Sequence, residues 1–327
     1  MTLLEEIRGR VAAMNRLCTF VKNGCDGMTA ALEAYLRQNS FRRYLFAGTG
    51  SGLAACALPV AYLRSLGYDA QAAEADSVKE LPEGTLLVAA YCSDMEAPVR
   101  ALLNRFRGGA VVAVAAEATP ASTLCGMTFS VKDGVAGTFP IAAFANVCAM
   151  LYEVAILITG DRAGADSLAE KLEWYAYITE GSAVSGHGLA RAFRKYLDDV
   201  KTVAFAGDGA DCAGREECVL LFKNKTSLTP SAISLCDAAA AETDAVVLFD
   251  FDPALRETVD HADETLRAAG KKTVYITNRD LPTLPHRLIL RLGVRDPFAA
   301  PLCETVMPEL FCAVDQLPAG THEVFGI

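Results

Sequence analysis

A short apolar run that ends in a glycine-rich turn occurs twice in this chain. Residues 43–52 read RYLFAGTGSG, and residues 202–209 read TVAFAGDG. An apolar strand followed at once by glycines and then by a helix is how a doubly wound α/β domain begins, because glycine lets the chain turn sharply beside the sheet. The repetition therefore predicts two α/β domains of one topology.

The rest of the sequence alternates between strand and helix patterns in both halves. The first half predicts strands over 43–48, 69–74, 84–92, 110–117 and 123–131, and helices over 51–67, 96–108 and 139–158. The second half predicts strands over 201–207, 244–251, 272–278 and 287–293, and helices over 213–225, 253–270 and 301–316. The strands are apolar along their whole length, which is typical of parallel sheets covered by helices on both faces.

The chain is long enough for two domains, since it has 327 residues. Helical periodicity precedes the first strand and also fills the stretch between the two alternating regions. We therefore divide the chain into an N-terminal helical segment (1–38), a first domain (39–160), a helical bridge (161–200) and a second domain with a C-terminal tail (201–327).

Charge and composition exclude several classes of function. The net charge is −10, and lysine and arginine residues do not cluster into a basic stripe, so we expect no nucleic-acid partner. The longest apolar stretch, 139–158, contains Asn146 and Glu153, which indicates a buried core helix rather than a membrane span. The N-terminus has no signal-peptide pattern. These features predict a soluble, cytoplasmic protein with no membrane partner.

The eleven cysteines form no metal or disulfide pattern. No CxxC occurs, no Cys/His group has zinc spacing, and most of the cysteines sit in apolar runs. We interpret them as small buried hydrophobic residues in a reducing compartment. The sequence therefore predicts neither a metal nor another cofactor.

Several stretches together resemble a known family. LFAGTGSGLAACALPVAYLRSLG resembles the first strand, loop and helix of a sugar isomerase (SIS) domain, and GTLLVAAYCSDMEAPVRALLNRFRGGAVVAVAAE resembles its second strand, phosphate loop, helix and third strand. VAFAGDGADCAGREECVLLFKNK is similar to the opening of the second domain of double-SIS proteins. These include the isomerase half of glucosamine-6-phosphate synthase and the fructosamine-6-phosphate deglycases.

The resemblance implies a fold, an assembly and a ligand. It implies two flavodoxin-like doubly wound domains, a homodimer or higher homo-oligomer, and an anionic sugar or sugar phosphate bound mainly by the first domain. Ligands of open α/β sheets bind beyond the carboxyl ends of the strands, which is where both glycine turns are predicted.

The first candidate ligand loop is Gly48-Thr49-Gly50-Ser51. Glycines let the backbone approach an anion, and Ser51 opens a helix, whose N-terminal N–H groups favour negative charge. A purely structural turn and a dinucleotide site are the alternatives. The dinucleotide pattern fails when it is counted from Gly48 and is met only loosely from Gly50, with Glu74 as the acid.

The other candidate ligand residues are Ser93, Glu96 and Thr138. The family carries a hydroxyl-rich phosphate loop where this chain has Ser93 between a cysteine and acids, so an anion other than phosphate is a second option. Ser93 and Glu96 also fit a helix-capping box, and Thr138 fits the N-cap of the long helix.

The candidate catalytic residues are Glu217, Lys223, Asn224 and His322. In the catalytic members of the family a glutamate near the end of the corresponding helix moves the proton between two sugar carbons, and by position this chain has Asn224 there. Glu217 is the candidate base, Lys223 and Asn224 give polar support, and His322 in the tail, or His187, is the candidate acid. The alternative is a non-catalytic sugar-binding or regulatory protein, because the family's histidine loop is also missing.

Overall fold

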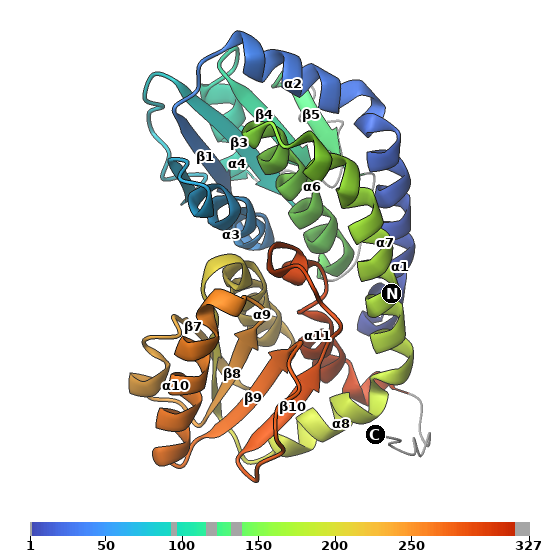
Figure 1. Ribbon diagram of the computed structural model, residues 1–327, viewed down its shortest axis with the longest axis vertical. Coiled ribbons are helices and arrows are strands. Elements are labelled where there is room, and N and C mark those ends of the chain that lie inside the picture. Colours follow the sequence, from blue (N-terminus) through green and yellow to red (C-terminus); the bar gives the residue numbers. More distant parts are fainter. Residues whose placement is uncertain (1, 93–96, 116–122, 132–138, 318–327) are drawn as a thin grey trace. The chain divides into compact units, whose positions relative to one another are not determined.

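Two five-stranded parallel sheets carry the fold, one in each half of the chain (Figure 1). The computed structural model describes residues 2–92, 97–115, 123–131 and 139–317. Contacts within the chain divide it into two units. The first sheet lies in the unit of Gly9–Ala136 and Pro140–Ala176, and the second lies in the unit of Met1–Arg8, Gly137–Phe139 and Tyr177–Ile327. The predicted α/β class with two parallel sheets is confirmed.

The first sheet has the strand order β2-β1-β3-β4-β5, and every neighbouring pair is parallel. Its strands are β1 (Arg43–Gly48), β2 (Ala70–Glu74), β3 (Thr85–Tyr91), β4 (Val111–Ala115) and β5 (Met127–Ser130). All residues of β3 and β4 are buried. Their continuous apolar sequence is explained by this burial, because both faces of these central strands are covered.

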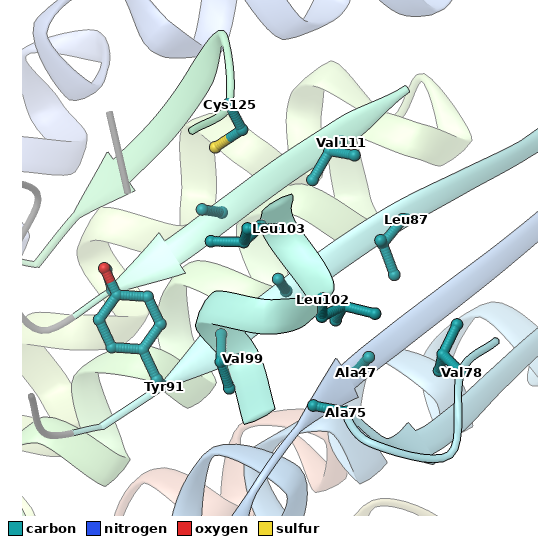
Figure 2. Packing of buried hydrophobic residues seen from close by; sticks show 13 residues of the cluster. Ala47, Ala75, Val78, Leu87, Tyr91, Val99, Leu102, Leu103, Val111 and Cys125 are labelled. Carbon is teal, nitrogen blue, oxygen red and sulfur yellow. The ribbon is translucent and has the colours of Figure 1, made fainter. Parts of the chain in front are cut away.

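The helices of the first unit cover both faces of its sheet. They are α1 (Leu3–Lys22, which belongs to this unit from Gly9 on), the 3-10 turn η1 (Gly24–Gly27), α2 (Met28–Gln38), α3 (Gly50–Ser65), α4 (Ala97–Arg105) and α6 (Ile141–Thr159). Helices α3 and α6 pack together on one face, and α4 packs on the other (Figure 1). Figure 2 shows Val99 and Leu102 of α4 against strand residues such as Leu87 and Val111. This cluster is one side of the core that holds β1 and β3 in place.

Helix α6 is long and apolar enough to cross a membrane. All of its residues except Ala142, Ile158 and Thr159 are buried within the protein. One of its polar residues, Asn146, donates from Nδ2 to the carbonyl oxygen of Ala13, 3.2 Å away. The prediction of a core helix over this stretch is therefore confirmed.

The second sheet repeats the topology of the first, with the order β10-β9-β8-β6-β7 and parallel pairs throughout. Its strands are β6 (Thr202–Ala206), β7 (Thr229–Ile233), β8 (Ala245–Asp250), β9 (Lys272–Thr277) and β10 (Arg287–Arg291). The sequence did not predict β7. It is an edge strand that includes Pro230 and is only half-buried, so it lacks the apolar run that marks the central strands.

The second unit also has helices on both faces of its sheet. The chain enters it within α7 (Arg162–Ser185), and α8 (His187–Tyr196), α9 (Cys212–Lys225), α10 (Arg256–Ala268) and α11 (Val306–Cys312) follow. Phe205 of β6 meets Phe222 of α9, which stacks on Phe311 of α11 with ring centroids 5.0 Å apart. Helix α10 packs on the opposite face of the sheet.

The single helix predicted over 301–316 is wrong in its extent. The structure has a 3-10 segment η5 (Pro297–Leu302), then α11, then a 3-10 turn η6 (Val314–Gln316). Two prolines, Pro301 and Pro308, cannot donate the backbone hydrogen bonds of one long helix. The break before α11 brings Glu304 and Thr305 into the interior, where both are fully buried.

Candidate functional site

The turn after β1 brings Gly48, Thr49, Gly50 and Ser51 together at the start of α3, as the sequence predicted. Thr49 is the extended N-cap residue, and its side chain makes no capping bond. Gly50 has a φ of +48°, which is in the left-handed region that glycine tolerates best. The N–H groups of Gly50 and Ser51 open the helix, where no earlier carbonyl of the helix can accept from them. Such a terminus favours an anion.

Two glycines of this turn are needed because backbones approach closely. A Cβ on Gly48 would lie 2.7 Å from both Gly52 C and Leu53 N, and 2.9 Å from the carbonyl oxygen of Ala90. A Cβ on Gly52 would lie 2.7 Å from the same oxygen. Glycine at these positions therefore seats the N-terminus of α3 directly against the ends of β1 and β3.

The turn lies at the topological switch point of the first sheet. The order β2-β1-β3 means that the chain leaves β1 in one direction and continues from β3 in the other. Ligands of open α/β sheets bind in the crevice outside the carboxyl ends of such strands. Tyr91 ends β3 beside this position and Cys92 follows it, whereas the predicted ligand residues Ser93, Glu96 and Thr138 lie outside the described residues.

The strand order argues against the dinucleotide alternative. A dinucleotide-binding sheet of the common type has its third strand outside its second, in the order 3-2-1-4-5-6. Here β3 lies on the other side of β1, and β2 is an edge strand. The sheet therefore has the flavodoxin-like order. Glu74, at the exposed end of β2, does not support a dinucleotide site.

The equivalent turn of the second sheet is surrounded by carboxylates. Asp208 accepts from the Leu235 N–H at 3.1 Å, and Arg215 donates to the carbonyl oxygen of Gly207 at 2.7 Å. At the end of β8, Asp250 is buried, accepts from the Thr277 hydroxyl and pairs with Arg279 at 3.3 Å. Each of these two aspartates is paired with an arginine, Asp208 with Arg215 and Asp250 with Arg279, so the polar groups at this turn are engaged within the protein.

The candidate catalytic residues of α9 lie in two different environments. Glu217 is buried, with 2% of its surface exposed, whereas Lys223 and Asn224 are exposed. Asn224 donates from Nδ2 to the carbonyl oxygen of Leu220 at 2.7 Å, one turn back in its own helix. Glu217 and Asn224 share a helix face but are about 10 Å apart along the axis. The structure therefore does not bring them together.

Of the two candidate acids, only His187 lies within the described residues. His187 is buried at the start of α8, with Nε2 2.9 Å from the carbonyl oxygen of Ala183. Ala183 lies in the last turn of the preceding helix α7, so this contact is typical of a core histidine whose ring nitrogen is satisfied by nearby backbone. His322 lies outside the described residues.

The sequence reasoning missed a set of buried carboxyl groups beside Glu217. Asp211, Glu304 and Glu309 are each at most 2% exposed. Burial, reinforced by Glu304, Glu309 and Glu217, raises the pKa of the Cys218 thiol on α9. The only signal in the sequence was that Glu304 and Glu309 interrupt an otherwise apolar stretch, PLCETVMPELF.

Two like units with the strand order of flavodoxin define the class of this protein, an α/β chain with two doubly wound parallel sheets. No protein-family profile and no curated protein sequence matches it. Among solved structures it is similar to the C-terminal domain of glucosamine-fructose-6-phosphate aminotransferase from Francisella tularensis, with a TM-score of 0.78, 15% identity, and coverage of 95% of this chain and 94% of that one.

It is also similar to tagatose-6-phosphate ketose/aldose isomerase from Escherichia coli, with a TM-score of 0.70 and 13% identity. That match covers 96% of this chain and 93% of the isomerase. At such identities the likeness is one of fold. The predicted resemblance to double-SIS proteins is confirmed in that sense.

Proposed function

We propose that this protein binds a sugar phosphate, or a sugar with another anionic group, at the turn after β1. The observation that carries the proposal is the glycine turn at the switch point, with the open N-terminus of α3 beside it. Two of the similar structures are of enzymes whose names contain a 6-phosphate sugar, which supports the same ligand class. We further propose that the protein is cytoplasmic and forms a homodimer or higher homo-oligomer. Light scattering on the purified protein tests the oligomeric state.

We propose aldose–ketose isomerisation, or a related deglycation, as the reaction. The chemistry needs a base that moves a proton between adjacent carbons and polar groups that stabilise the enediolate. Glu217 is the proposed base, with Lys223 and Asn224 as polar support and His322 as the acid. Glu217 is favoured over Glu216 because it is the buried carboxylate of α9.

The second candidate function is binding without catalysis. It is favoured by Asn224, an exposed amide that bonds to its own helix and cannot act as a general base. Asn224→Glu restores a carboxylate at this position. If the lost glutamate alone silenced the chemistry, this variant gains activity that the natural chain lacks.

Loss of deuterium from a 2-deuterated sugar 6-phosphate separates the two functions. An isomerase releases the label to water, and Glu217→Gln abolishes the release while binding remains. Glu216→Gln is the matched control, because its side chain is 42% exposed on the same helix. Saturable binding with no release of deuterium by the natural protein contradicts the isomerase proposal and leaves the binding proposal standing.

A further inference from the structure

A second cavity lies on the first sheet, at the amino ends of its strands. Its volume is about 230 Å³, and its lining includes Arg43, Leu45, Asp69, Gln71, Pro82 and Thr85. Arg43 and Thr85 begin β1 and β3, whereas Gly48 of the ligand turn ends β1. The length of β1, roughly 16 Å, therefore separates this cavity from the proposed sugar-phosphate site.

Four of the lining side chains share one face of the sheet. Successive residues of a strand point to opposite faces, and residues aligned between parallel neighbours point to the same face. Arg43 is aligned with Thr85, and Leu45 is aligned with Gln71. Ala47, two residues beyond Leu45, belongs to the core cluster beneath α4 (Figure 2). The cavity therefore lies on the α4 face of the sheet.

Thr85 brings a buried hydroxyl group to this cavity. The residue is 7% exposed, and its Oγ1 has no hydrogen-bond partner among the described residues. Such a hydroxyl is destabilising, because it has lost its bonds to water and has gained none within the protein. A ligand that fills the cavity would supply the missing partner.

The charged groups of the lining cancel each other. Nε of Arg43 lies 3.2 Å from Oδ2 of Asp69, and the two side chains are 55% and 48% exposed. A guanidinium has five N–H donors and a carboxylate has four acceptor sites, so one such contact does not exhaust the pair. Gln71, an exposed amide, adds a donor and an acceptor. The cavity thus offers donors and acceptors without a net charge.

These properties select one class of ligand. Asp69 opposes an anion, and Arg43 opposes a cation. A planar base would need an aromatic face on which to stack, but Tyr44, the aromatic residue of the lining, is only 7% exposed. A molecule with several hydroxyl groups fits, because each hydroxyl both donates and accepts, and its C–H groups can pack on Leu45 and Pro82.

We propose that this cavity is a second ligand site of the first unit and binds a small uncharged molecule with several hydroxyl groups, such as a free sugar. The ligand's hydroxyls bond to Thr85, to Gln71 and to the Arg43–Asp69 pair. The site differs from the turn after β1 in its position and in its preference for an uncharged ligand. The inference does not depend on the proposed function, because no residue of that turn takes part.

Saturation-transfer NMR with D-glucose, D-galactose and myo-inositol tests the site. We expect a saturable signal from at least one of these three probes. Thr85→Val replaces the hydroxyl with a methyl group of the same size and should weaken binding at least about tenfold. The variant should be at least as stable as the natural protein in urea, because the lost hydroxyl has no partner among the described residues. This readout separates lost binding from lost folding.

Two control variants locate the bound probe. Ser51→Asp changes the turn after β1, and Thr265→Val removes a hydroxyl from α10 of the second unit. Both should bind the probe as tightly as the natural protein does. The proposal is overturned if none of the three probes gives a saturable signal, or if Thr85→Val binds as tightly as the natural protein. Binding that Ser51→Asp abolishes and Thr85→Val retains would place the probe at the turn, which also overturns it.

Discussion

Replacing Gly48 with alanine tests whether α3 must sit directly on the ends of β1 and β3. The new Cβ would meet three backbone atoms at 2.7–2.9 Å, and none of them belongs to a side chain that can rotate away. Ordinary contact begins at 3.4 Å, so the helix terminus and the strand must separate by about 0.7 Å. Overpacking of this kind costs roughly 1–3 kcal/mol, and the rigid neighbours place Gly48→Ala near the upper value.

Thermal unfolding followed by circular dichroism measures this cost. A loss of about 2–3 kcal/mol lowers the midpoint by roughly 4–12 °C in a unit of this size. The control is Gly126→Ala, because Gly126 has no atom within 4 Å of the added Cβ and no positive φ. Its stability should change by less than about 0.5 kcal/mol. If Gly48→Ala is as stable as Gly126→Ala, the close seating of α3 is refuted.

Three further substitutions test the second unit. Phe222→Ala removes a fully buried ring that stacks on Phe311 and should cost about 3–5 kcal/mol in urea unfolding; a loss below 1 kcal/mol refutes the aromatic core. Arg279→Ala should cost about 3–5 kcal/mol at pH 7, because it leaves buried Asp250 without its ion-pair partner. Burial already raises the pKa of Asp250, so that loss should shrink at pH 4, and equal losses at both pH values contradict the reasoning. Asn224→Ala should leave stability within about 0.5 kcal/mol, and a larger loss shows that its exposed amide has a structural role.

The central strands and the first ligand turn could be predicted because local sequence determines them. Continuous apolar runs such as LLVAA within β3 are typical of strands that are covered on both faces, which fixes their place in the sheet. The turn at Gly48 combines a strand end, a left-handed glycine and a helix start within a few residues. Each of these features has a sequence signature that needs no knowledge of the tertiary structure.

The edge strand and the buried carboxyl groups Asp211 and Glu304 depend on tertiary contacts and could not be predicted. Strand β7 is polar and contains Pro230, so only its pairing with β6 makes it a strand. Asp211 and Glu304 are distant in the sequence, and each resembles an ordinary surface acid when it is read alone. Gly214 leaves space for the Glu304 carboxyl, a contact between residues that are distant in the sequence.

The central claim is that an anionic sugar binds at the N-terminus of α3. Isothermal titration of tagatose 6-phosphate into the natural protein, Ser51→Asp and Ser65→Asp tests it most directly. A carboxylate at position 51 suits the helix dipole but repels a bound anion, and Ser65 adds the same charge at the opposite end of the same helix. The proposal predicts saturable binding that weakens at least about tenfold, or 1.4 kcal/mol, in Ser51→Asp and persists in Ser65→Asp. Equal affinity of Ser51→Asp and the natural protein contradicts it.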